Sequence, residues 1–345
     1  MEPSAHPGSP GPAISVVIST HNRAALLPEV VEALFAQRDA PPFEVILVDN
    51  ASTDGTRDLV ETLSAEHPEL RAAHEPRPGV SHGRNLGIAL ARAPIVAFTD
   101  DDVRVSPDWL ATIDRCLKEH PEADWIGGRV LPRWTAEPPG WLTRAHWAPL
   151  ALLDYGEAPL VIGRTRRLCL LTASLAVRSD ALHAVGGFSP QFTRCVDHEL
   201  LIRLWNTGRQ GLYWPDLVVE TDVPPERMTK AYHRMWHKRT ARLYAQIPPE
   251  DLFSDENGAP AQRVVSLFGV PSFTFRELLG ESRALLRSWF RGSESTRFHH
   301  ELRVRHLLQY MTRRYLLCRR QQRSSRLREI REFFRQIRHK KGWVG

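Results

Sequence analysis

The stretch Ile95-Val96-Ala97-Phe98-Thr99-Asp100-Asp101-Asp102 decides the fold. Four consecutive apolar residues are typical of a central strand that is buried on both faces of a parallel sheet. Ser106 and Pro107 follow, and a capping residue before a proline is a signal for the start of a helix. The three carboxylates therefore occupy a turn between a strand and a helix, at the edge where open α/β sheets bind ligands.

The negative charge of this turn indicates a cation site. Three adjacent carboxylates repel one another and lose hydration when they are partly buried, and a bound divalent cation relieves both costs. The alternative is a solvated acidic turn without a ligand. A buried strand directs these groups toward the crevice of the sheet rather than toward open water, which favours the cation site.

Strands and helices alternate around this stretch from residue 14 to residue 120. Short runs rich in β-branched residues predict strands, and apolar residues at helical spacing predict the helices between them. We expect strands at 14–18, 43–48, 70–74 and 95–98, with helices at 26–37, after 53, after 79 and at 107–119. This alternation predicts an α/β fold, a Rossmann-like domain with a mostly parallel central sheet and helices on both faces.

The chain changes character twice after residue 120. Strands are expected at 125–130, 168–177 and 211–219, an irregular loop with three tryptophans at 131–147, and a helix from Asp197. Beyond Pro224-Pro225 the pattern becomes helical and rich in arginine. We therefore divide the chain into a flexible leader (1–13), a main domain (14–223, with halves 14–120 and 121–223) and a basic helical extension (224–345).

Charge is distributed unevenly over the 345 residues. The net charge is +6, but residues 281–345 alone contain 18 Lys and Arg against five Glu. This basic amphipathic tail is compatible with peripheral contact with anionic lipid, with a solvated helical face or with a homodimer contact. Nucleic-acid binding ranks low because few aromatic residues accompany the arginines.

Cysteine usage and hydropathy limit the compartment. The four cysteines are widely separated and show no metal-binding spacing, which favours reduced thiols. No segment reaches the roughly 18 apolar residues of a membrane span. We expect a cytoplasmic protein that is at most peripheral on the inner face of a membrane.

Six segments, in this order, resemble the signature of family-2 glycosyltransferases. They are Ile18-Ser19-Thr20-His21-Asn22-Arg23, Val48-Asp49-Asn50-Ala51-Ser52-Thr53-Asp54-Gly55-Thr56, Gly83-Arg84-Asn85, Asp100-Asp101-Asp102, Val185-Gly186-Gly187-Phe188, and Asp197-His198-Glu199-Leu200 with Arg203-Leu204. Each segment alone is a weak signal, but their order is specific. The resemblance implies an A-type nucleotide-sugar-binding fold and an inverting, metal-dependent transfer of a sugar from a nucleoside diphosphate.

The resemblance also assigns the donor-binding residues. Residues after the first two strands would hold the base and ribose, and Arg84, near a helix start, would bind the diphosphate. The base-and-ribose set is Ser19, Thr20, His21, Asp49 and Asn50. Simpler alternatives are a helix N-cap for Ser19 or Thr20, a turn-forming role for Asn50 and a surface position for Arg84. Many family members have a carboxylate at the position of Asn50, so the identity of the base stays open.

The acidic turn would hold Mg²⁺ or Mn²⁺ together with the diphosphate oxygens. Asp102 is the expected metal ligand. Asp100 would contact either the ribose or the metal, and Asp101 could take either part, so the ligand assignment within this DXD-type motif stays open.

Inversion requires a base on the acceptor side, and the resemblance assigns this role to Asp197. Most family members have Glu-Asp here, whereas this chain has Val196-Asp197. The alternative for Asp197 is an acidic residue favoured only by the dipole of its helix. The expected enzyme is a hexosyltransferase of polysaccharide or cell-envelope biosynthesis with a glycan, lipid-linked or small-molecule acceptor. A sugar-nucleotide nucleotidyltransferase and a catalytically inactive scaffold are the alternatives.

Overall fold

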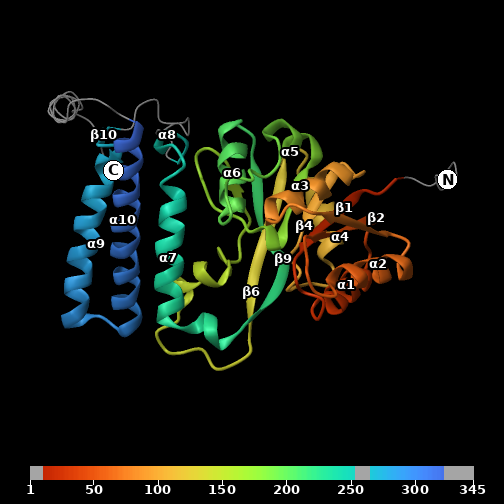
Figure 1. The fold of residues 1–345 in the computed structure, drawn as a ribbon, viewed down its shortest axis with the longest axis horizontal. Helices are drawn as coiled ribbons and strands as arrows, with labels where there is room; N and C mark the ends of the chain where they lie inside the picture. The colour runs from red at the N-terminus through yellow and green to blue at the C-terminus, as the bar shows by residue number, and fades with distance from the viewer. Residues whose placement is uncertain (1–10, 253–264, 322–345) are drawn as a thin grey trace. The chain divides into compact units, whose positions relative to one another are not determined.

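The computed structural model describes residues 11–252 and 265–321, and the chain divides into two compact units (Figure 1). The first unit consists of the residues up to Arg133 together with Ala151–Asp222. The second consists of Trp134–Leu150 and the residues from Val223 onward. The loop at 134–150, which we expected in the second half of the main domain, therefore clusters with the C-terminal helices.

The first half of unit 1 contains the expected parallel sheet. Its strands are β1 (Ile14–Thr20), β2 (Phe43–Asn50), β3 (Leu70–Glu75) and β4 (Ile95–Phe98). They pair in parallel in the order β3-β2-β1-β4. The accompanying helices are α1 (Leu27–Phe35), α2 (Thr56–Glu66), α3 (Val80–Leu90) and α4 (Trp109–Glu119). Strand β4 is wholly buried, as its apolar run predicts.

The second half extends the same sheet with antiparallel strands. Strand β8 (Leu175–Arg178) pairs antiparallel with β4 and with β6 (Trp125–Trp134). Strand β9 (Gly211–Val223) pairs antiparallel with β5 (Val103–Val105) and β7 (Leu160–Ile162). The description "mostly parallel" therefore applies to the first half of the sheet. The strand expected at 168–177 is shorter, because a 3₁₀ turn (Thr172–Ser174) precedes β8.

Two more helices complete unit 1. Two glycines of α3 bring that helix close to the sheet. The short helices are α5 (Ser179–Val185) and α6 (Val196–Asn206). In α3, a Cβ atom at Gly87 would collide with the side chain of Val17, and one at Gly83 would collide with the hydroxyl of Ser19. The absence of side chains at these two positions lets α3 lie directly against β1, which brings Arg84 to the end of that strand.

Unit 2 is mainly helical. Its long helices are α7 (Lys230–Tyr244), α9 (Ser272–Arg291) and α10 (Glu294–Gln321). Shorter elements are α8 (Pro249–Leu252), the pair β10 (Ser266–Leu267) and β11 (Val270–Pro271), and 3₁₀ turns at Arg144–His146, Ala148–Leu150 and Pro225–Met228. Trp141 from the 134–150 loop packs with Phe298 and Leu302 of α10, which explains why the loop belongs to this unit.

The ends of the chain limit what can be compared with expectation. Most of the expected leader (1–13) and the tail beyond residue 321 lie outside the described residues. Within the described residues, none of the helices has both the length and the apolar character needed to cross a bilayer.

Candidate active site

The polar residues that follow β1, β2 and β4 are brought to one edge of the sheet. β1 lies between β2 and β4, and the parallel register places Thr20 opposite Asp49. The segments Ser19–His21, Asp49–Asn50 and Asp100–Asp102 therefore end adjacent strands on the same side, as the sequence predicted for the carboxyl edge.

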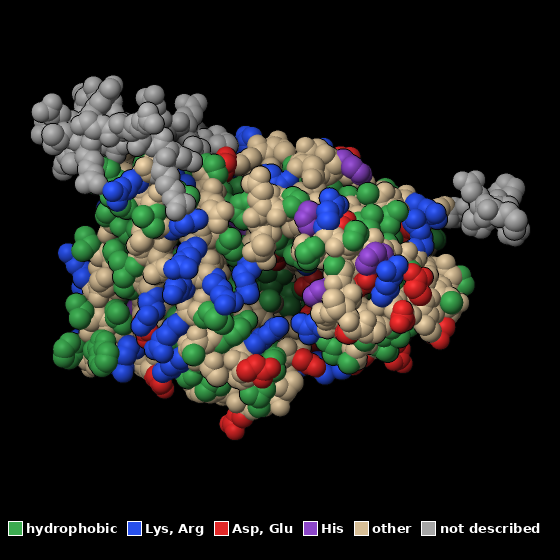
Figure 2. All heavy atoms as spheres, viewed as in Figure 1, with side chains coloured by type: hydrophobic (Ala, Val, Ile, Leu, Met, Phe, Trp, Pro, Cys, Tyr) green, Lys and Arg blue, Asp and Glu red, His purple; other side chains and the backbone are tan. Residues whose placement is uncertain are grey.

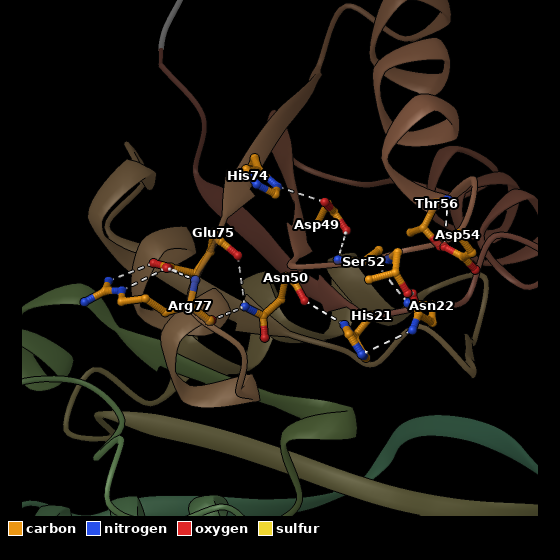
Figure 3. Close-up of polar contacts among 11 residues, drawn as sticks. His21, Asn22, Asp49, Asn50, Ser52, Asp54, Thr56, His74, Glu75 and Arg77 are labelled. Atoms are coloured by element: carbon orange, nitrogen blue, oxygen red, sulfur yellow. Dashed lines mark hydrogen bonds and ion pairs between the residues drawn. The ribbon is translucent and has the colours of Figure 1, made fainter.

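Asp49 is buried and held in place on two sides. The ring of His74 donates a hydrogen bond from Nδ1 to Oδ2 of Asp49 at 2.8 Å, and the backbone N–H of Ser52 donates to Oδ1 at 3.2 Å (Figure 3). Strand β3 thus supports the end of β2. Asp49 thus stabilises the turn after β2.

Asn50 connects the end of β2 to the loop that precedes α3. Its amide nitrogen donates to the backbone carbonyls of Glu75 and Arg77, at 3.2 and 2.7 Å (Figure 3). Its amide oxygen accepts from Gly79 N at 2.9 Å. Both amide hydrogens are engaged, so the group that Asn50 can offer a ligand is the remaining lone pair of its oxygen.

His21 lies beside Asn50 on an exposed turn. Its Nδ1 donates to the backbone carbonyl of Asn50 at 2.8 Å, and its Nε2 lies 3.3 Å from the amide nitrogen of Asn22 (Figure 3). These contacts fix the ring and leave its face available for stacking on a base.

The three carboxylates of the acidic turn have different partners. The hydroxyl of Thr20 donates to Asp101 at 2.7 Å, and the guanidinium of Arg84 donates to Asp100 at 2.7 Å. The backbone carbonyl of Asp102 accepts a hydrogen bond from Thr221 of β9 at 3.3 Å. Burial, together with the negative charges of Asp102 and Asp100, raises the pKa of Asp101 to about 6. The turn therefore holds more negative charge than its surroundings neutralise.

Arg84 forms an ion pair with the acidic turn and lies close enough to Asp197, the expected base, to lower its pKa. Its side chain is buried, and its guanidinium lies 5.3 Å from the centre of the Phe188 ring. Burial raises the pKa of Asp197, the positive charge of Arg84 lowers it, and the negative charge of Asp100 raises it. The structure therefore places Asp197 within electrostatic range of both Arg84 and Asp100.

Hydrogen bonds from Arg203 to Glu199, Val185 and Gly187 hold α6, the helix that carries Asp197. We call these contacts the Arg203 bracket. Arg203 forms a two-pronged ion pair with Glu199 at 2.7 Å and donates to the carbonyls of Val185 and Gly187. This fixes the first turns of α6 against the Gly186-Gly187 turn. The backbone of Thr172 lies near Asp197 and lowers its pKa, against the larger effect of burial.

A second bracket connects the same turn to α3. The amide of Asn85 donates to the carbonyl of Phe188 and accepts from its N–H, both at 2.8 Å. Gly187 has φ +69°, and a Cβ atom there would collide with the amide oxygen of Asn85. Our sequence analysis quoted Asn85 and Arg203 within matching segments but gave neither a role. The only signal for them in the sequence was their place within those segments.

The acidic turn suits a cation that takes its remaining ligands from the substrate. No group of three or more His, Cys, Asp or Glu side chains is arranged to hold a metal ion alone in the part of the chain that the structure describes. Mg²⁺ and Mn²⁺ bound to nucleotides characteristically use one or two carboxylates together with phosphate oxygens and water. Burial and the neighbouring carboxylates raise the pKa of Asp101, which disfavours its charged form, and a bound cation would stabilise that form.

Two family models match this chain. A model described as glycosyl transferase family group 2 matches residues 95–312, and one described as glycosyl transferase family 2 matches residues 15–170. The chain belongs to glycosyltransferase family 2, and its fold is the A-type fold that the sequence motifs predicted.

Two curated relatives give the range of the similarity. The chain is 33% identical over 212 residues to a glucosyl-dolichyl phosphate glucuronosyltransferase of Haloferax volcanii, covering 58% of this chain and 66% of that protein. It is 38% identical over 105 residues to a validoxylamine A glucosyltransferase of Streptomyces hygroscopicus subsp. limoneus, covering 30% of this chain and 23% of that protein. The chain therefore spans less than two thirds of either relative.

A solved structure supports the fold. The mannosyltransferase PcManGT of Pyrobaculum calidifontis, in complex with GDP-Man and Mn²⁺, superposes with a TM-score of 0.57 at 19% identity. The similarity covers 88% of each chain.

Proposed function

We propose that the protein is an inverting glycosyltransferase that moves a sugar from a nucleoside-diphosphate sugar to an acceptor hydroxyl. The observation that carries the proposal is the position of Asp197. It lies within electrostatic range of Arg84 and Asp100, although it belongs to α6 in the second half of unit 1 and they belong to the first half. The donor side contributes the carboxylate of Asp100 and the buried guanidinium of Arg84, and the acceptor side contributes the carboxylate of Asp197. An inverting transfer uses such an acceptor-side carboxylate as its general base.

The donor would lie along the carboxyl edge of the parallel strands. His21 would offer a ring face to the base, and Ser19, Thr20 and Asp49 would contact the donor from the ends of β1 and β2. Asn50 contributes mainly by holding the loop before α3. Arg84 is already aimed at the acidic turn, where its charge can also attract the diphosphate.

Asp102 and Asp100 would hold Mg²⁺ or Mn²⁺ at the acidic turn, with Asp101 next to them. When bound, the ion would stabilise the negative charge that develops on the departing diphosphate. That PcManGT was solved with both Mn²⁺ and GDP-Man supports this assignment.

Asp197 would accept the proton of the attacking hydroxyl at a carboxylate oxygen. Its raised pKa makes it a stronger base than an ordinary aspartate. The Arg203 bracket holds the helix that carries this carboxylate, without the neighbouring glutamate that most family members have. Val196 stands at that position and is buried.

The acceptor belongs to the glycan, lipid-linked or small-molecule classes. The names of the relatives include a dolichyl-phosphate-linked sugar and the small molecule validoxylamine A. None of the four cysteines, all of which lie in the described part of the chain, forms a disulfide, which favours a reducing compartment such as the cytoplasm.

The test separates donor binding from transfer. A thermal-shift panel of nucleotide sugars with and without Mn²⁺ identifies the donor, and release of the nucleoside diphosphate then measures turnover. Asp197→Asn should keep metal-dependent donor binding and lower turnover by about 10² to 10⁴-fold. Asp58→Asn is the matched control, because Asp58 is also an acidic residue in the first turn of a helix in unit 1.

Each alternative gives a different result. If Asp197 acts only through the helix dipole, both substitutions should have the same small effect. A nucleotidyltransferase would release pyrophosphate from a nucleoside triphosphate and a sugar phosphate. An inactive scaffold would show no turnover in the unsubstituted protein. Donor binding that is equally tight with and without Mn²⁺ would contradict the metal assignment.

A further inference from the structure

The outer side of α9 exposes a row of large apolar side chains. Leu279, Leu286, Trp289 and Phe290 are 57%, 63%, 65% and 86% exposed. The spacing of seven and then four residues places Leu279, Leu286 and Phe290 along one line of the helix. Figure 2 shows hydrophobic side chains gathered along the outer edge of α9, at the left of the view, with Lys and Arg side chains beside them. Clusters of this kind mark interaction surfaces more often than isolated exposed residues do.

A row of arginines runs alongside these apolar residues. Arg276, Arg283, Arg287 and Arg291 are all exposed and recur at intervals of seven and four residues. At the end of the helix, the guanidinium of Arg297 lies 4.9 Å from the centre of the Trp289 ring.

The acidic residues inside α9 point elsewhere. Glu277 pairs with Arg303 of α10, and Glu281 pairs with His300 and Arg303 of the same helix. The exposed charges of α9 in the described part of the chain are therefore all positive. We define Leu279, Leu286, Trp289, Phe290 and the four arginines as the α9 face.

We propose that the α9 face docks onto an anionic lipid surface, with the helix lying in the headgroup layer. Leucine, phenylalanine and tryptophan beside a stripe of arginines form the pattern of a helix that lies in a membrane interface. Tryptophan favours this layer because its ring is both apolar and polar. A helix of 20 residues is about 30 Å long, so several headgroups can contact the arginines at once.

Charge complementarity selects a lipid surface over a second copy of the chain. Two α9 faces in contact would bring two arginine rows into one interface without an exposed acidic partner from α9, and like charges in an interface are costly. Anionic headgroups neutralise the arginines, while the acyl region accepts the apolar row. This assigns membrane contact to α9, whereas our sequence analysis left lipid contact as one of three alternatives for the basic tail.

The inference goes beyond the proposed transfer reaction, and its test needs no donor or acceptor. The full chain is mixed with vesicles of phosphatidylcholine containing about one fifth phosphatidylglycerol, and with pure phosphatidylcholine vesicles, and bound protein is measured by sedimentation. We expect binding to the anionic vesicles that weakens as salt rises. Arg283→Gln/Arg287→Gln should weaken binding about 25-fold, at about fivefold for each arginine. Trp289→Ser/Phe290→Ser should also abolish most of the binding.

Matched substitutions elsewhere in unit 2 provide the controls. Arg239→Gln/Arg242→Gln removes two exposed arginines of α7, and Leu308→Ser/Leu316→Ser removes two exposed leucines of α10. Both should bind like the unsubstituted protein. Absence of vesicle binding by the unsubstituted chain, or equal losses in the controls, would overturn the proposal. So would a change from a dimer to a monomer on Trp289→Ser/Phe290→Ser without any lipid binding, because that result would identify a second copy as the occupant.

Discussion

Replacing Arg203 by alanine tests whether the bracket on α6 holds the expected base in position. The substitution removes the two-pronged pair with Glu199 and two hydrogen bonds to the carbonyls of Val185 and Gly187. The Glu199 side chain is only 11% exposed, so its carboxylate would be left in a poorly hydrated place.

The expected loss of stability follows from this burial. Breaking a buried ion pair by removing one partner costs about 3 to 5 kcal/mol. Arg203 is itself 29% exposed, so solvent screens part of the interaction and the lower end, about 3 kcal/mol, applies. Lys118→Ala is the matched control, because Lys118 forms a pair with Asp114 at the same i,i+4 spacing but is 73% exposed. That loss should be about 0.5 kcal/mol or less.

Urea unfolding of both variants measures the difference, provided that the m-values agree. Arg203→Ala/Glu199→Gln should recover part of the loss, since the remaining group is then uncharged. In the donor-turnover assay, Arg203→Ala should lower kcat more than it raises KM, and Arg203→Lys should recover part of the loss. A stability loss for Arg203→Ala within about 1 kcal/mol of that for Lys118→Ala would refute the reasoning.

Two further predictions concern packing and pH. Gly87→Ala should destabilise the protein by about 1 to 3 kcal/mol, because the new methyl group collides with Val17. The control Gly280→Ala lies in open space on α9 and should stabilise the protein by about 0.5 to 1 kcal/mol. Equal thermal shifts for the two variants would contradict the close approach of α3 to β1. Burial lowers the pKa values of His146 and His233 to about 4. The unfolded chain takes up their protons near the ordinary pKa of 6.5, so stability is complete above that pH and falls as the pH drops toward 4. Each histidine should cost about 2 kcal/mol between pH 7 and pH 5, and His233→Phe should flatten the pH dependence of urea unfolding.

The parallel half of the fold was predictable because its signals are local. The apolar run before Asp100 and the alternation from residue 14 to residue 120 identified the four strands, the helices between them and the edge at which the polar residues gather. The expected role of Asp197 as the base stays a prediction. Arg203 and Glu199, which hold its helix, both lie in the segments that the sequence analysis quoted.

Other features depend on contacts between distant residues. Trp141 meets Phe298 and Leu302 across more than 150 positions, and no local pattern reveals such a pairing. The role of Asn50 was equally hidden, because an amide that binds backbone carbonyls has the same sequence signature as one that is free to read a base. The antiparallel half of the sheet is set by tertiary pairing rather than by periodicity.

The discontinuous make-up of unit 2 bears on any attempt to shorten this protein. A chain cut after Val223 would retain Trp141 but lose the aromatic and aliphatic surface of α10 that shelters it. The exposed indole would then promote aggregation during expression. A poor yield of the shortened chain would be mistaken for evidence that catalysis needs the helices. A minimal version should therefore delete the helices and replace residues 134–150 with a short polar link in the same step.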